Sequence, residues 1–169
     1  AGTNIEDVQN SIKNKKRAPN CATCWALEDQ GLTSERQLHN QAFDFYLNTD
    51  IEQIEQDAVA NGFTTKIVKL NTSNLCNGAC MTCGPGASTA WARLKRFPIE
   101  YQAMNPLDLE LDYEQIIQLS FIGGEPLLER QNFLVLERLI ESGNTGCFIS
   151  IVTNGSIELN ERQLNILSK

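Results

Sequence analysis

The spacing of apolar residues predicts a helical N-terminal part. The segments with helical spacing are residues 5–13, 36–46 and 51–61. Asp50 and Gln53 fit a capping box at the start of the third segment, and Gly62 fits its end. Residues 18–25 combine a proline, an asparagine and two cysteines, which is typical of a turn. We therefore expect short helices joined by loops in this part of the chain.

The rest of the chain alternates between short β-rich runs and longer runs with helical spacing. The predicted strands are residues 66–70, 116–122 and 147–152. The predicted helices are residues 88–97, ended by Pro98, residues 127–142, and a last helix that begins near Asn160 and is still running at Lys169. This alternation predicts an α/β fold of parallel βα units with right-handed crossovers.

The loops that follow the three predicted strands carry the candidate chemistry. The first contains three cysteines, the second reads Gly-Gly-Glu-Pro at 123–126, and the third reads Thr-Asn-Gly at 153–155. In parallel βα folds, ligands bind beyond the carboxyl ends of the strands. If the three strands are neighbours, these loops converge on one side of the sheet.

The cysteine loop has the spacing C-x3-C-x2-C, formed by Cys76, Cys80 and Cys83. Three thiolates this close in sequence can hold one face of a cubane iron–sulfur cluster. One iron then has no protein ligand and is free to coordinate a substrate or cofactor. A zinc site with a fourth ligand elsewhere is the alternative, although zinc ligands usually occur as two pairs. The spacing favours a [4Fe–4S] cluster.

Composition and charge narrow the classes of partner. The chain has 169 residues, 41% hydrophobic, with a formal net charge of −7, and such a surface repels nucleic-acid phosphates. No apolar run reaches the length of about 18 residues that a membrane span needs. The polar N-terminus lacks the apolar stretch of a signal peptide. We expect a cytoplasmic protein that binds neither nucleic acid nor membrane.

The distribution of the cysteines indicates metal or redox chemistry. Five of the six cysteines fall into two tight clusters, whereas a disulfide framework spreads its cysteines through a small secreted chain. The sixth, Cys147, is expected to be a small hydrophobic residue in a strand.

Two other residues are expected to have structural positions. His39 is expected at the surface of a helix. Trp91 has helical spacing with Ala87 and Leu94 and is expected to lie in a core.

In these motifs the chain resembles the radical S-adenosylmethionine superfamily. That family has C-x3-C-x2-C at the end of the first barrel strand, Gly-Gly-Glu-Pro after the second and often Thr-Asn-Gly after the third. The chain matches all three in order, over about residues 64–169. The resemblance implies that residues 50–169 form the first half of a (β/α)6 partial TIM-like barrel, preceded by an N-terminal cysteine-bearing segment, residues 1–49.

The resemblance also implies an activity. The open iron would chelate S-adenosylmethionine, and the backbone of Gly123, Gly124 and Glu125 would bind the methionine amino group, with Pro126, Thr153 and Asn154 completing the cofactor site. Cleavage of the cofactor by an electron from a flavodoxin or ferredoxin would give a 5′-deoxyadenosyl radical that abstracts hydrogen from a substrate. By analogy the substrate is a peptide or protein. No side chain is predicted to be catalytic itself.

One residue departs from the family pattern. The residue before the third cysteine is commonly aromatic in the family and packs near the adenine, but here it is Thr82. Adenine packing must then come from elsewhere. The sequence Cys83-Gly84-Pro85, followed by Ser88 and Trp91, looks like members with a twitch domain.

Cys21 and Cys24 form a C-x2-C motif followed by Trp25. The motif looks like the cysteine-bearing edge of auxiliary-cluster domains (twitch or SPASM-like), which bind a second iron–sulfur cluster. Two thiolates cannot fill a four-ligand site, so further ligands would lie outside this chain. The alternatives for this pair are that it binds zinc, forms a disulfide or binds no ligand.

The chain has only three strand–helix units and begins at Ala1, so we expect it to be a piece of a longer enzyme. A half barrel exposes sheet edges, which predicts self-association or a covering partner chain. The alternative function is a non-catalytic iron–sulfur or zinc module for electron transfer or assembly. The Gly-Gly-Glu-Pro motif favours the enzyme, because a metal module has no need of it.

Overall fold

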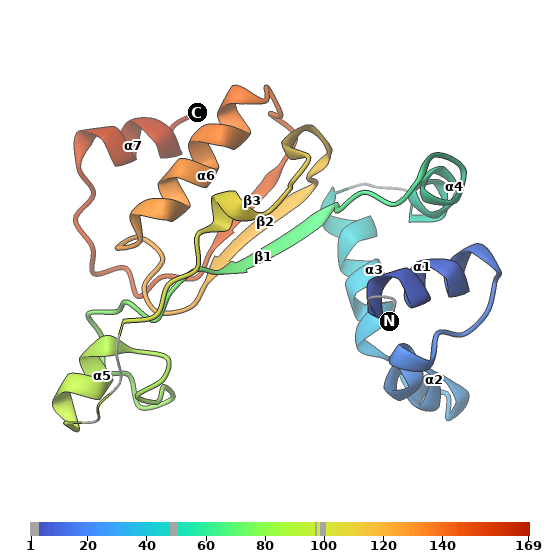
Figure 1. Cartoon of the computed structure of the whole chain (residues 1–169), viewed down its shortest axis with the longest axis horizontal. Coiled ribbons are helices and arrows are strands. Elements are labelled where there is room, and N and C mark those ends of the chain that lie inside the picture. Colours follow the sequence, from blue (N-terminus) through green and yellow to red (C-terminus); the bar gives the residue numbers. More distant parts are fainter. Residues whose placement is uncertain (1–3, 48–50, 97, 99–100) are drawn as a thin grey trace. The chain divides into compact units, whose positions relative to one another are not determined.

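The computed structural model describes residues 4–47, 51–96, 98 and 101–169. The chain divides into two compact units between Thr64 and Thr65. We call them unit 1, up to Thr64, and unit 2, from Thr65; Figure 1 labels their helices and strands. The domain boundary expected between residues 49 and 50 lies outside the described residues.

Unit 1 is helical in its described residues. Its elements are α1 (Asn4–Lys13), the 3-10 helix η1 (Pro19–Cys21), α2 (Ala22–Asp29), α3 (Glu35–Leu47) and α4 (Ile51–Asn61). The three predicted helices are therefore confirmed, and Gly62 follows α4 with φ of +101°, a conformation that glycine adopts without strain. The predicted capping residue Asp50 lies outside the described residues. The turn predicted over residues 18–25 is wrong in its second half, because α2 begins at Ala22.

Unit 2 has a parallel three-stranded sheet in the order β1-β2-β3. The strands are β1 (Ile67–Asn71), β2 (Gln118–Ile122) and β3 (Phe148–Ile151). The helices are α5 (Thr89–Leu94), α6 (Arg130–Glu141) and α7 (Glu161–Leu167), with 3-10 helices η2 (Pro106–Asp108) and η3 (Tyr113–Gln115). The predicted α/β fold with parallel strands is confirmed. Among the described residues the sheet is open, with free edges at β1 and β3.

The ends of three helices differ from the prediction for local reasons. α5 stops at Leu94, and Arg96 then has φ of +54°, which breaks the helix before Pro98; its predicted last residue, Phe97, lies outside the described residues. α6 begins at Arg130, because residues 125–129 form turns. α7 ends at Leu167 with Ser168 as its C-cap, so it does not run to the end of the chain.

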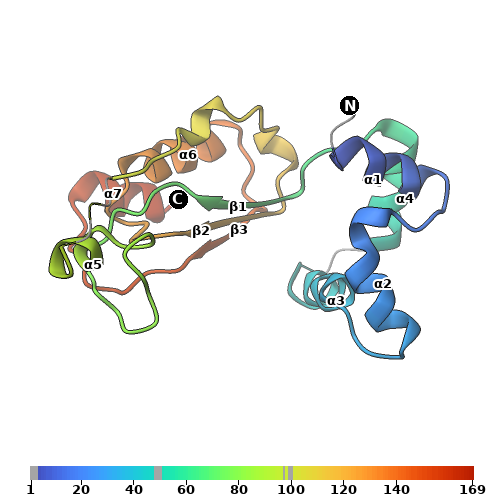
Figure 2. The same cartoon turned by 60° about the horizontal axis from the view of Figure 1, so that its bottom comes forward.

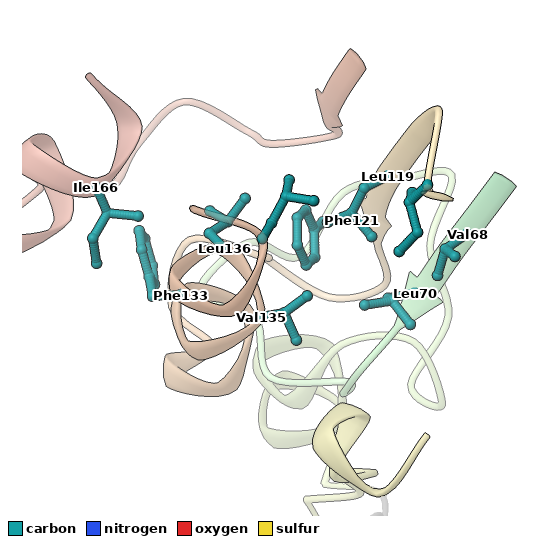
Figure 3. Close-up of a cluster of buried hydrophobic side chains, with 10 residues drawn as sticks. Val68, Leu70, Leu119, Phe121, Phe133, Val135, Leu136 and Ile166 are labelled. Carbon is teal, nitrogen blue, oxygen red and sulfur yellow. The ribbon is translucent and has the colours of Figure 1, made fainter. Parts of the chain in front are cut away.

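One face of the sheet forms the core of unit 2 (Figure 3). The buried strand residues are Val68, Leu70, Leu119 and Phe121, and they pack with Phe133, Val135, Leu136 and Leu139 of α6 and Ile166 of α7. α6 lies over this face, and α7 packs against α6 (Figure 2). Burying each side chain of this kind stabilises the fold by about 1.5–3 kcal/mol. This packing fixes the strands, and with them the loops at their carboxyl ends.

Candidate functional site

The loops after β1 and β2 continue side by side beyond the ends of the strands. The Gly124 N–H donates to the Ser73 carbonyl at 3.0 Å, and the Glu125 N–H donates to the Leu75 carbonyl at 2.7 Å. A Cβ on Gly124 would overlap the Leu75 carbonyl group. Only glycine therefore allows the Gly-Gly-Glu-Pro loop to approach the cysteine loop this closely.

Glu125 joins the second loop to the third. Its side chain is 2% exposed, and its carboxylate accepts hydrogen bonds from the Thr153 hydroxyl at 2.8 Å, the Asn154 N–H at 2.8 Å and the Leu127 N–H at 3.0 Å. A carboxylate is acceptor-only when ionised, so these three donors match it. Glu125 is the one carboxylate that the sequence singles out, with its backbone expected to matter more than its side chain; in the structure the side chain also positions the third loop.

Asn154 joins the third loop to the cysteine loop. Its Nδ2 donates to Asn77 Oδ1 at 2.9 Å, Asn77 Nδ2 donates to Ser156 Oγ at 2.8 Å, and Ser156 Oγ donates back to Asn154 Oδ1 at 2.6 Å. These three side chains form a closed ring of hydrogen bonds. We call it the amide ring (Asn77, Asn154 and Ser156). The structure thus brings the three predicted loops together, as the sequence suggested.

The thiols of Cys76 and Cys80 lie next to Gly78. A Cβ built on Gly78 would lie 3.6 Å from Cys80 Sγ, 3.8 Å from Cys76 Sγ and 3.4 Å from Asn154 Nδ2. The Gly78 N–H donates to Cys76 Sγ at 3.3 Å. Cys76 is buried, whereas Cys80 and Cys83 are exposed. The thiols of Cys76 and Cys80 therefore both border Gly78, and those of Cys80 and Cys83 are accessible from solvent.

The start of α5 supports the cysteine loop from the other side. Ser88 caps the helix and donates to the Gly78 carbonyl at 2.7 Å, and the Thr89 hydroxyl donates to the Cys76 carbonyl at 3.1 Å. The Trp91 indole N–H donates to the Cys80 carbonyl at 2.7 Å. The prediction of a core position for Trp91 is therefore wrong: its ring N–H is bound to the cysteine loop, and its helix neighbour Leu94 is 68% exposed.

The three thiols of the cysteine loop are candidate ligands for a metal group. Within the residues that the structure describes, no three His, Cys, Asp or Glu side chains are gathered tightly enough to hold one metal ion. A cubane cluster binds each thiolate to a different iron, so its ligands do not meet at one point. Three unpaired cysteines on one loop, two of them exposed, are a donor set of that kind.

A cavity of about 560 Å³ lies beside the loops in unit 2. Its lining residues come from the last residues of β1 and β2, from the segments that follow these strands and from residues 102–104; they include Asn71, Ser73, Asn74, Gln102 and Gly123. The volume falls within the range of about 300–1,000 Å³ that is usual for small-molecule sites.

Tyr101 is adjacent in sequence to Gln102, which lines the cavity. Its hydroxyl donates a hydrogen bond to the Glu129 carboxylate, and this bond raises the pKa of Tyr101, which keeps the phenol protonated.

The remaining predicted residues lie elsewhere. Cys21 and Cys24 belong to unit 1, where both are partly exposed at the start of α2. Cys147 packs beside the core of unit 2, as predicted, but it precedes β3 and does not lie in the strand; burial raises the pKa of its thiol. His39 is exposed on α3, 3.7 Å from the Glu35 carboxylate. No helix in the described part of the chain is long and apolar enough to cross a membrane.

Comparison of the chain with models of known families, with curated proteins and with solved structures gave no match.

Proposed function

We propose that this chain binds a [4Fe–4S] cluster through Cys76, Cys80 and Cys83 and is part of a radical S-adenosylmethionine enzyme acting on a peptide or protein. The observation that carries the proposal is the joining of three loops by Glu125 and the amide ring. A module that only held metal would need the cysteine loop but not this connection. In the same proposal the open sheet is the first half of a (β/α)6 barrel.

Each loop has a separate role in this proposal. The cysteine loop holds the cluster, with Gly78 leaving room between the Cys76 and Cys80 thiols. When bound, the reduced cluster supplies one electron for cleavage of S-adenosylmethionine to a 5′-deoxyadenosyl radical, which abstracts hydrogen from the substrate. The backbone of residues 123–126 binds the methionine group of the cofactor. Thr153 and Asn154 hold the third loop against it.

Three further proposals follow from the first. The electron comes from a flavodoxin or ferredoxin. The protein works in the cytoplasm, where thiols stay reduced and available as ligands. The cavity beside Asn71 and Gly123 is the space for the cofactor or the reacting part of the substrate, because it borders both loops.

The test is electron paramagnetic resonance of the chain after anaerobic reconstitution with iron and sulfide and reduction with dithionite. We expect a [4Fe–4S]⁺ signal that changes when S-adenosylmethionine is added, because the cofactor coordinates the open iron. Formation of 5′-deoxyadenosine provides a second readout. C80A removes one exposed ligand and should abolish the signal, whereas C147A removes a thiol away from the loop and should preserve it.

Two outcomes contradict the proposal. A cluster signal unchanged by S-adenosylmethionine would indicate an electron-transfer module. Tightly held zinc without any cluster would indicate a structural metal site.

A further inference from the structure

Cys21 and Cys24 of unit 1 occupy positions that suit a direct bond between them. Cys21 ends η1 and is the N-cap of α2, and Cys24 is the third residue of that helix. Residues one helical turn apart have Cα atoms separated by about 5 Å. Disulfides span Cα distances of about 4.4–6.8 Å. Both thiols are unpaired and partly exposed, so a small thiol reagent can reach them.

The surrounding side chains hold this segment in place. Arg17, which precedes it, forms two hydrogen bonds of 2.7 Å with Asp29 at the end of α2, and this pairing lowers the pKa of Asp29. Arg36 likewise binds Glu28 through two nitrogens, at 3.2 and 2.8 Å.

The two guanidinium groups also lie over the ring of Trp25, which follows Cys24. They are 5.0 Å from the ring centroid for Arg17 and 4.6 Å for Arg36. Arg17 and Arg36, on either side of the cysteine pair in the sequence, are thus both bound to α2.

The number of donors distinguishes a dithiol from a metal site. A structural zinc ion or an iron–sulfur cluster takes four protein ligands, or three when one position stays open. Cys21 and Cys24 supply two thiol donors, fewer than either kind of site needs. A disulfide needs two thiols and no other ligand.

We propose that Cys21 and Cys24 form a redox-active dithiol that exchanges with small-molecule disulfides of the glutathione type. One cysteine, as its thiolate, attacks a sulfur of the small disulfide and releases one small thiol, which takes up a proton. The second cysteine attacks the mixed disulfide, closes the Cys21–Cys24 bond and releases the second small thiol. The protein loses two electrons and two protons, and the small disulfide gains them.

The test uses the full chain, equilibrated at a series of ratios of reduced to oxidised glutathione, quenched with acid, alkylated and digested with trypsin. Cleavage after Arg17 and Arg36 gives peptide 18–36, which contains Cys21 and Cys24 and no other cysteine. Cys147 lies in peptide 139–162, and the cysteine triplet lies in peptide 70–93. Mass spectrometry therefore reports the pair separately from the other four cysteines.

We expect the two thiols of peptide 18–36 to become protected from alkylation together and to lose two hydrogens without gaining glutathione. The transition should reverse on returning to reduced glutathione. In C21S or C24S, the remaining cysteine should instead carry a glutathione adduct, and peptide 139–162 should stay alkylatable as the internal reference.

Three results would overturn the proposal. The first is two independent glutathione adducts in the unmodified chain, and the second is two thiols that stay alkylatable at every ratio. The third is zinc or iron that copurifies in a triple Cys76/Cys80/Cys83→Ser variant and blocks oxidation until a chelator removes it; that result would assign the pair to a metal.

Discussion

At the scale of single residues, the Glu125 carboxylate connects the second and third loops of unit 2. The described residues give it three hydrogen-bond donors, and none of them is a cation. E125Q keeps the shape of the side chain but replaces one acceptor oxygen with an NH2 group that faces other donors. Because hydrogen bonds to a charged group contribute about 1.5–3 kcal/mol, we expect the free energy of unfolding of unit 2 to fall by about that amount.

The measurement is urea denaturation followed by the fluorescence of Trp91, in a W25F background so that unit 2 alone is reported. Glu110 is exposed, which makes E110Q a matched control with the same change of charge. That control should change the free energy by no more than about 0.5 kcal/mol. Equal effects of E125Q and E110Q would show that the hydrogen bonds of Glu125 do not stabilise the loops.

At the scale of elements, the close approach of the first two loops depends on Gly124. In G124A the added Cβ overlaps backbone atoms of Leu75. Backbone atoms cannot move away by a rotamer change, as a flexible side chain can. We expect a loss of about 1–3 kcal/mol in the free energy of unfolding, as for other overpacked sites. G86A is the control, because a Cβ on Gly86 meets no atom within 4 Å. The same urea denaturation measures both, and an unchanged midpoint in G124A would contradict the observed packing.

The elements were predictable where their signal is local. β1, β2 and β3 are short β-rich runs, and they lie within two residues of their predicted bounds. The end of α5 was not predictable, because it depends on the positive φ of Arg96, a residue type without that preference. The late start of α6 follows from the turns at 125–129, and the proline in Gly-Gly-Glu-Pro indicated a turn without fixing its length.

The site was predictable only where residue type carries the chemistry. Cysteine spacing and the Gly-Gly-Glu-Pro sequence were visible without a structure. Asn77, Ser156 and Trp91 were missed as site residues, because Asn77 bonds Ser156 across 79 positions and Trp91 bonds a carbonyl. Such contacts depend on the fold and cannot be recognised in a single sequence. The one available signal was Asn77, which lies between Cys76 and Cys80. An asparagine at this position is equally consistent with an ordinary loop.

At the scale of the whole molecule, the two units differ in how much interior they have. The buried hydrophobic cluster belongs to unit 2, whereas in unit 1 the described buried residues are Ala18 and Ser34. Regions with few buried apolar contacts open with a lower free energy than a packed core. We therefore expect amide hydrogens of α1, α2 and α4 to exchange much faster than those of β2 and α6, as measured by hydrogen-exchange mass spectrometry on the intact chain.

The variant L119A tests whether this difference comes from the core. Leu119 is fully buried in β2, and its truncation leaves a cavity that should lower the free energy of opening of β2 and α6 by about 2–5 kcal/mol. Exchange in α1 and α2 should be unchanged, because those helices belong to the other compact unit. L164A truncates a leucine of α7 that is 54% exposed and should alter exchange little in either unit. Faster exchange throughout the chain in L119A would mean that the two units unfold as one cooperative body.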